Sequence, residues 1–195
     1  MRVALNLVFA LAAPAFAPAQ VTVEFDNPWV HVSRVKLAAR EKLPTRDYPD
    51  SVVVSITTGK TAFVNQGKQT VENDSDRPVE EILIELKPDA PKEEAQKVTL
   101  DPVKLDSKYH TVDFENDRVR ILRTVLDPHI KSPLHQHPHY VVVYLTQLHT
   151  KMALKDGRVV DNVRRQGEVD WRDFMQHSTE NVGDRRAMEI QVELK

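Results

Sequence analysis

Short runs of β-branched, aliphatic and aromatic residues, separated by turn residues, recur along the whole chain. Within several runs apolar and polar positions alternate, which turns one face of a strand toward a core and the other toward solvent. The runs cover residues 29–37, 50–58, 60–64, 80–87, 118–126, 139–147, 150–156 and 188–195. Outside 1–19 and 88–109, no stretch keeps a helical period for three turns. This pattern predicts an all-β protein, either a sandwich or a small barrel.

The chain also contains an internal repeat, which indicates two copies of one small domain. The matching blocks are 22–27 with 111–116 and 42–54 with 131–143, both at an offset of 89, and 71–87 with 179–195 at an offset of 108. The offsets differ by 19 residues (108 − 89), so copy two holds a segment that copy one lacks. We expect this segment to be a hairpin and place it around 159–178.

Four segments follow from the repeat: a signal peptide at 1–19, an N-terminal copy at 20–87, a linker at 88–109 and a C-terminal copy at 110–195. The signal assignment rests on Arg2, an apolar run and small residues near Ala19, over a length too short to span a bilayer. The linker is rich in Pro, Lys, Glu and Asp, with one helical turn expected at KEEAQK. We predict a periplasmic or secreted protein with no membrane attachment after cleavage. The alternative is an uncleaved N-terminal anchor.

The amino-acid composition excludes several kinds of active site and two classes of binding partner. The chain has no cysteine, which excludes thiol nucleophiles, iron–sulfur clusters and cysteine-type zinc sites. Its net charge is only −2, which gives no electrostatic footprint for nucleic acid or an anionic membrane. This charge does not select a substrate. The partner that we expect is a small-molecule ligand. Because each copy alone is small, we expect the two to pack as a pseudo-dimer, and a homo-oligomer stays open.

Histidines distinguish the two copies. His135 and His137 are two residues apart, so on a strand both side chains point to the same face. His177 follows later in the same copy, and three imidazoles that converge form a typical metal face. The alternative is a surface or hydrogen-bonded histidine cluster. The corresponding positions of copy one hold residues that cannot bind metal in this way: Arg46, Tyr48 and Gln69.

Two segments of copy two resemble the motifs of the cupin superfamily, whose members are small jelly-roll barrels. The first motif, a His-x-His pair, reads HQHPHYVVVY here, and the second, which ends in His with Asn four residues later, reads GEVDWRDFMQHSTEN. Because the repeat covers both copies, the mature chain resembles a bicupin, with two cupin-type jelly-roll β-barrel domains from an internal duplication. It is similar to short bacterial cupin-domain proteins. The resemblance implies one divalent metal held by His135, His137 and His177 at the barrel mouth.

The chain departs from the cupin motifs in two places. The glutamate expected after His-x-His falls at Val141 or Val142, and the Pro-x-Gly turn is replaced by residues 173–175. The first change leaves three histidines, which suit Fe, Zn, Ni, Cu or Mn. The second puts the position of His177 in question.

Other residues are assigned by their nearness to the motifs. We expect Tyr140, Tyr144, Gln147 and His139 to contact a substrate, and no catalytic residue is assigned. His31, His110, His129 and His149 follow no pattern and are expected in solvent. Glu85 and Glu193 end equivalent strands, and we expect them to have only a structural role.

Three functions fit these observations. The first is a metal-dependent oxygenase, isomerase or lyase acting on a small polar molecule. The second is a non-catalytic protein that captures a small ligand or a metal in the periplasm. The third is a structural module, whose histidines would affect neither metal content nor stability.

Overall fold

A computed structural model describes residues 19–91 and 97–195, so residues 1–18 of the predicted signal peptide and most of KEEAQK lie outside the described residues. The regular secondary structure of the described residues is almost entirely strand, which confirms the predicted fold class. Its elements are β1 (Gln20–Asp26), β2 (Val30–Leu37), β3 (Arg46–Tyr48), β4 (Ser51–Ser55), β5 (Thr61–Val64), β6 (Gly67–Gln69), β7 (Val79–Leu86), α1 (Pro102–Leu105), β8 (His110–Glu115), β9 (Val119–Leu126), β10 (His135–His137), β11 (Tyr140–Tyr144), β12 (Leu148–Leu154), β13 (Val159–Arg164), β14 (Val169–Arg172), β15 (Met175–Asn181) and β16 (Ala187–Leu194).

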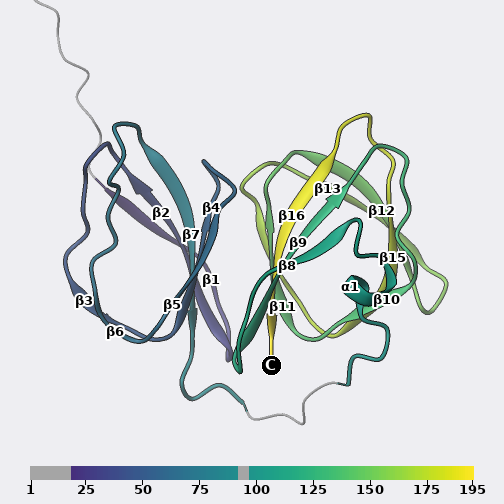
Figure 1. The fold of residues 1–195 in the computed structure, drawn as a ribbon, viewed down its shortest axis with the longest axis horizontal. Helices are drawn as coiled ribbons and strands as arrows, with labels where there is room; N and C mark the ends of the chain where they lie inside the picture. The colour runs from purple at the N-terminus through teal and green to yellow at the C-terminus, as the bar shows by residue number, and fades with distance from the viewer. Residues whose placement is uncertain (1–18, 92–96) are drawn as a thin grey trace, which may run out of the picture.

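The strands form four layers (Figure 1). Two five-stranded sheets lie in the middle, with strand orders β1-β2-β7-β4-β5 and β14-β11-β16-β9-β8. A two-stranded ribbon, β3-β6, covers the outer side of the first sheet. A four-stranded sheet, β10-β15-β12-β13, covers the outer side of the second. Each half of the chain thus forms a barrel with a five-stranded sheet as one wall and a smaller sheet as the other.

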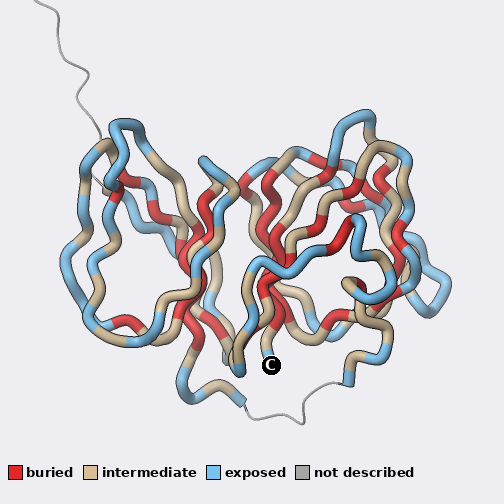
Figure 2. Tube along the Cα trace, in the orientation of Figure 1, coloured by how far each residue is buried: buried red, intermediate tan, exposed pale blue. Residues whose placement is uncertain are grey.

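One apolar cluster joins the two halves, and Figure 2 shows it as the buried centre of the molecule. It combines side chains from β2, β4 and β7 with side chains from β9, β11 and β16. On β7, Ile82 and Ile84 are completely buried in this cluster. Because strand side chains alternate, Glu81, Leu83 and Glu85 of the same strand face the interior of their own barrel. Polar contacts at the margin also join the halves, including one of 2.6 Å from Arg34 Nη2 to the carbonyl oxygen of Gly167.

Strand pairing locates the hairpin that the N-terminal copy lacks. β4 pairs β5 with Val52 opposite Phe63, and β11 pairs β14 with Val141 opposite Trp171. The first members of these pairs differ by 89 and the second by 108, so the 19 additional residues lie between the two strands. They form the hairpin β12-β13. Our placement around 159–178 was therefore too late in the chain.

The end of the predicted linker packs on the C-terminal barrel. The N–H groups of Thr99 and Leu100 donate to Gln136 Oε1 over 2.8 and 3.1 Å. Asp101 caps the short helix α1 by accepting from Val103 N–H over 2.9 Å. This segment therefore fixes Asp101 beside β10, where it contributes to the site described below.

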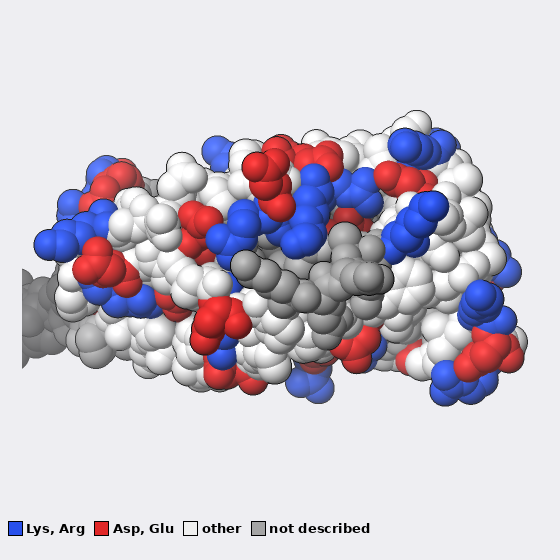
Figure 3. Space-filling view, turned by 90° about the horizontal axis from the view of Figure 1, so that it is seen from below, with Lys and Arg blue, Asp and Glu red and all other residues white. Residues whose placement is uncertain are grey.

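Charged side chains of both signs share the molecular surface, as one face in Figure 3 shows. The described residues contain no helix with the length and apolar character needed to cross a membrane.

Candidate metal centre

The strand pair β10-β15 brings the three predicted histidines together. His135 and His137 lie on the same face of β10, and the pairing register sets His177 of β15 directly opposite His135. The ring centroids are 4.6 Å apart for His135 and His177 and 4.9 Å apart for His135 and His137. One nitrogen from each ring lies within 4.8 Å of the other two, so the three residues could hold a metal ion. The altered turn at 173–175 does not displace His177, because β15 is already in register at Met175.

Hydrogen bonds orient two of the rings. His135 Nδ1 lies 2.7 Å from the carbonyl oxygen of Pro133, and His137 Nδ1 lies 2.6 Å from Glu193 Oε1. With Nδ1–H as the donor in both rings, each Nε2 is left as an acceptor. His137 Nε2 and His177 Nδ1 are buried and have no partner among the described residues.

Buried ring nitrogens without hydrogen-bond partners indicate that the site is suited to bind a metal ion. An unsatisfied buried acceptor costs about 1–3 kcal/mol, and coordination to a cation removes this cost. Burial lowers the pKa of His137 and His177 well below the ordinary value, and mutual repulsion among the histidines adds to this effect. Burial likewise lowers the pKa of His135. The rings are therefore neutral near pH 7, which is the form that binds a divalent ion.

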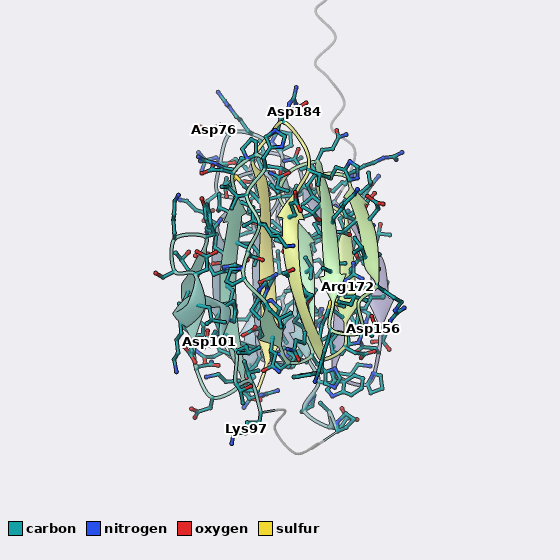
Figure 4. All side chains as sticks on the ribbon, turned by 90° about the vertical axis from the view of Figure 1, so that its right-hand side faces the viewer. Asp76, Lys97, Asp101, Asp156, Arg172 and Asp184 are labelled. Atoms are coloured by element: carbon teal, nitrogen blue, oxygen red, sulfur yellow. The ribbon has the colours of Figure 1, made fainter. Side chains whose placement is uncertain are left out.

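A chain of charged groups supports His137 from behind. Glu193 is buried and receives a second hydrogen bond, from Arg120 Nε, at 2.6 Å. Arg120 Nη1 in turn bonds Asp101 Oδ2 at 2.8 Å, and Figure 4 shows Asp101 beside α1 at the edge of the barrel. Burial raises the pKa of Glu193, and the hydrogen bond from Arg120 opposes that rise. Glu193 is therefore more than a strand end, contrary to our expectation. Its spacing from His137 has no sequence signature, because the contact depends on how β16 lies in the barrel.

A fourth histidine lies beside the cluster and was misplaced by sequence reasoning. His110 is only 1% exposed, and its ring centroid is 5.1 Å from that of His135. Burial lowers its pKa to about 4. Our expectation of a solvated side chain was wrong, because His110 begins the edge strand β8, which pairs with β9, and its side chain turns into the barrel beside His135. His31 is partly exposed, and His129 and His149 are exposed.

Of the four predicted substrate contacts, Tyr140 lies against the histidine cluster. Its ring is tilted against that of His137 at a centroid distance of 4.9 Å, and its hydroxyl donates to Met175 Sδ at 4.0 Å. Tyr144 donates to Asp170 Oδ2 at 3.1 Å in a polar group away from the histidines. Gln147 is exposed. The ring of His139 contacts those of Trp29 and Trp171, at centroid distances of 4.9 and 5.6 Å, and the two tryptophan rings stack on each other at 5.2 Å.

A small cavity adjoins the histidine face inside the barrel. Its volume is about 20 Å³, room for about one water molecule. Glu189 of β16 lines it together with His135 and His177, and sequence reasoning missed this residue. Burial raises the pKa of Glu189 to about 7, so its carboxyl group exchanges a proton near neutral pH. Gln191 Nε2 donates to Glu189 Oε1 at 2.8 Å and orients it. Glu189 thus supplies a carboxyl group to this cavity, while the group of potential metal ligands among the described residues consists of the three histidines.

In the N-terminal copy a guanidinium group lies where the histidines lie in the other copy. The ribbon β3-β6 pairs Arg46 with Gln69, just as β10-β15 pairs His135 with His177. Arg46 bonds both oxygens of Glu85 at 3.0 Å, and its guanidinium lies 3.6 Å from the ring centroid of Tyr48. Within the described residues, the histidine group of the C-terminal copy is the one set of three potential ligands with its ligating atoms close together.

Comparisons with known proteins give similarity in structure but not in sequence. No family model and no curated protein matches the chain. The structure of AerE from Microcystis aeruginosa is similar with a TM-score of 0.61 and 9% identity, covering 91% of this chain and 97% of that one. A variant of oxalate decarboxylase from Bacillus subtilis is similar with a TM-score of 0.60 and 11% identity, covering 90% and 72%. A cupin 2 conserved barrel domain protein from Leptotrichia buccalis gives 0.50 and 11%, covering 95% and 93%.

Proposed function

The chain has the cupin fold in two copies, and we propose that it is an exported bicupin that binds one divalent metal through His135, His137 and His177. The observation that carries this proposal is the set of three buried imidazoles whose potential ligand nitrogens lie within 4.8 Å of one another. Two buried nitrogens of the set, His137 Nε2 and His177 Nδ1, have no partner among the described residues. The proposal of export is supported only by the amino-acid composition of residues 1–19. We propose further that the two halves pack as a pseudo-dimer, with the N-terminal half as its metal-free partner.

We propose that the site carries out oxygenase, isomerase or lyase chemistry on a small polar molecule. A divalent ion bound there would supply polarisation of an oxygen atom or activation of O₂ or water. Glu189 holds or releases a proton at its carboxyl group, because its pKa of about 7 matches neutral pH. Gln191 keeps that carboxyl group oriented toward the cavity. His110, neutral because of burial, excludes water from the side of β8.

The metal proposal is tested by elemental analysis of protein purified without chelator or affinity nickel. We expect about one transition metal per chain, the stoichiometry of a single three-nitrogen site. The triple variant His135→Ala, His137→Ala, His177→Ala should lose it. The matched triple variant Arg46→Ala, Tyr48→Ala, Gln69→Ala should keep it. A wild-type protein without metal, even after each ion is added back, overturns the proposal.

A non-catalytic role in ligand or metal capture is the second candidate. The observation that favours it is the size of the cavity beside the histidines, which has room for about one water molecule. Oxygen consumption and turnover of small acids and thiols by the metal-loaded protein separate the two roles. Turnover that Glu189→Gln lowers at least about tenfold supports catalysis. Stable metal binding with no turnover supports capture.

A further inference from the structure

The N-terminal barrel contains a cavity that the metal centre does not use. Its volume is about 200 Å³, smaller than the roughly 300 Å³ at which pockets for drug-sized ligands begin. Its wall includes the apolar residues Val53, Val64 and Leu83 and the hydroxyl-bearing residues Tyr48 and Ser51. The shape and lining therefore suit a ligand of a few carbon atoms with one polar end.

Glu81 gives the cavity one uncompensated carboxylate. It lines the wall, and its carboxylate has neither a hydrogen bond nor an ion pair with any residue that the structure describes. Burial raises its pKa, and no neighbouring cation opposes this rise. The other acidic residue of the wall, Glu72, is already paired with Lys42. No described residue therefore supplies a positive partner for Glu81.

The duplication shows which donor Glu81 lacks. Glu81 pairs with Val35 in β7-β2, and its counterpart Glu189 pairs with Thr124 in β16-β9. In the C-terminal copy, Thr124 bonds Gln191 at 3.1 Å, and Gln191 donates to Glu189 at 2.8 Å. In the N-terminal copy, Leu83 stands at the position of Gln191, and Val35 at that of Thr124. The carboxylate is present in both copies, but in the N-terminal copy no described residue takes the place of Gln191 and donates to it.

We propose that this cavity binds a small primary ammonium ion with a short aliphatic chain. The ammonium group would donate to Glu81, and the chain would lie against the apolar wall. A charged donor suits a half-buried carboxylate best, since charge-assisted hydrogen bonds are about twice as strong as neutral ones. The hydroxyl oxygens of Tyr48 and Ser51 offer further acceptors for an ammonium group. A metal ion is a poorer match, because one free carboxylate does not provide its ligand set.

Titration calorimetry of the full chain with n-butylammonium chloride tests the proposal, with n-butanol as the neutral analogue. We expect saturable 1:1 binding of the amine and at least about tenfold weaker binding of the alcohol, as expected for one lost charge-assisted bond. Glu81→Gln should weaken amine binding by at least the same factor. Leu83→Gln, which supplies the donor that Gln191 supplies in the other copy, should weaken it too, although the carboxylate remains.

Glu72→Gln is the control, because it makes the same change at a carboxylate that already has a partner. It should leave the affinity within about twofold, since an exposed pair contributes little. Circular dichroism of each variant checks that it folds. Equal binding of amine and alcohol, an unchanged affinity in Glu81→Gln, or no binding at millimolar amine each overturns the proposal. None of these readouts depends on the metal centre, so they do not bear on the proposed function.

Discussion

Glu193→Gln is the sharpest test of how the tertiary structure supports the metal centre. Glu193 accepts two hydrogen bonds, from His137 Nδ1 and from Arg120 Nε, each over 2.6 Å. A glutamine of the same shape has one acceptor oxygen and one NH₂ group. Whichever way it is turned, its NH₂ group faces a donor, either the imidazole N–H or the guanidinium.

The expected magnitude follows from this conflict. Loss of a residue that orients a metal-binding histidine typically lowers metal affinity about 10–100-fold, or roughly 1.4–2.7 kcal/mol. The metal-free protein should also lose about 1–3 kcal/mol of stability, the cost of one unsatisfied buried polar group. Both effects should appear together, because the same carboxylate orients the His137 ring and accepts the hydrogen bond from Arg120.

Competition with a chromophoric chelator measures zinc affinity, and urea unfolding of the metal-free protein measures stability separately. Glu85→Gln is the matched control, since it removes the equivalent carboxylate of the N-terminal copy, which bonds Arg46 and no histidine. It should reduce stability and leave zinc affinity unchanged. If folded Glu193→Gln binds zinc within about twofold of wild type, the positioning role assigned to Glu193 is refuted.

Three further variants test the fold and its electrostatics. Asn181→Ala removes a buried amide that donates to the carbonyl oxygens of Leu126 and Arg185, and the free energy of urea unfolding should fall by about 2–4 kcal/mol. A loss below about 1 kcal/mol would contradict the stabilising role of these two hydrogen bonds. Ile84→Ala opens a cavity between the two halves and should cost about 2–5 kcal/mol, and unchanged unfolding would mean that the cluster does not join them. Glu81→Gln should remove a pH dependence: because burial raises the folded pKa of Glu81 above the ordinary 4.5, wild-type stability falls as pH rises above 4.5. A series of urea midpoints from acid to neutral pH shows whether this fall disappears in the variant.

The sequence by itself determined the strands, the duplication and the histidine face. Alternation of apolar and polar residues is a local property, so residues 29–37 or 188–195 can be assigned to strands without knowing their partners. The same local rule places His135 and His137 on one face, and the comparison of the copies isolates them from Arg46 and Tyr48. The loss of the motif glutamate at Val141 and Val142 was also visible, because the resemblance of HQHPHYVVVY to the cupin motif places the glutamate at these positions.

Only the tertiary structure decided which distant side chains meet. Glu193, Glu189 and His110 reach the centre because β16 lies between β9 and β11, and because β8 lies at the sheet edge beside β9. Alternation gives the face of each strand, but it does not say which strand lies across the barrel. The position of the additional hairpin also needed the tertiary structure. Between the two matching blocks the sequence does not show where the offset changes from 89 to 108, and the pairing of β11 with β14 places that change before β14. Gln147 and His139 follow the motifs in sequence but lie outside the strands, so alternation does not set the direction of their side chains. Their contact with a substrate stays a prediction.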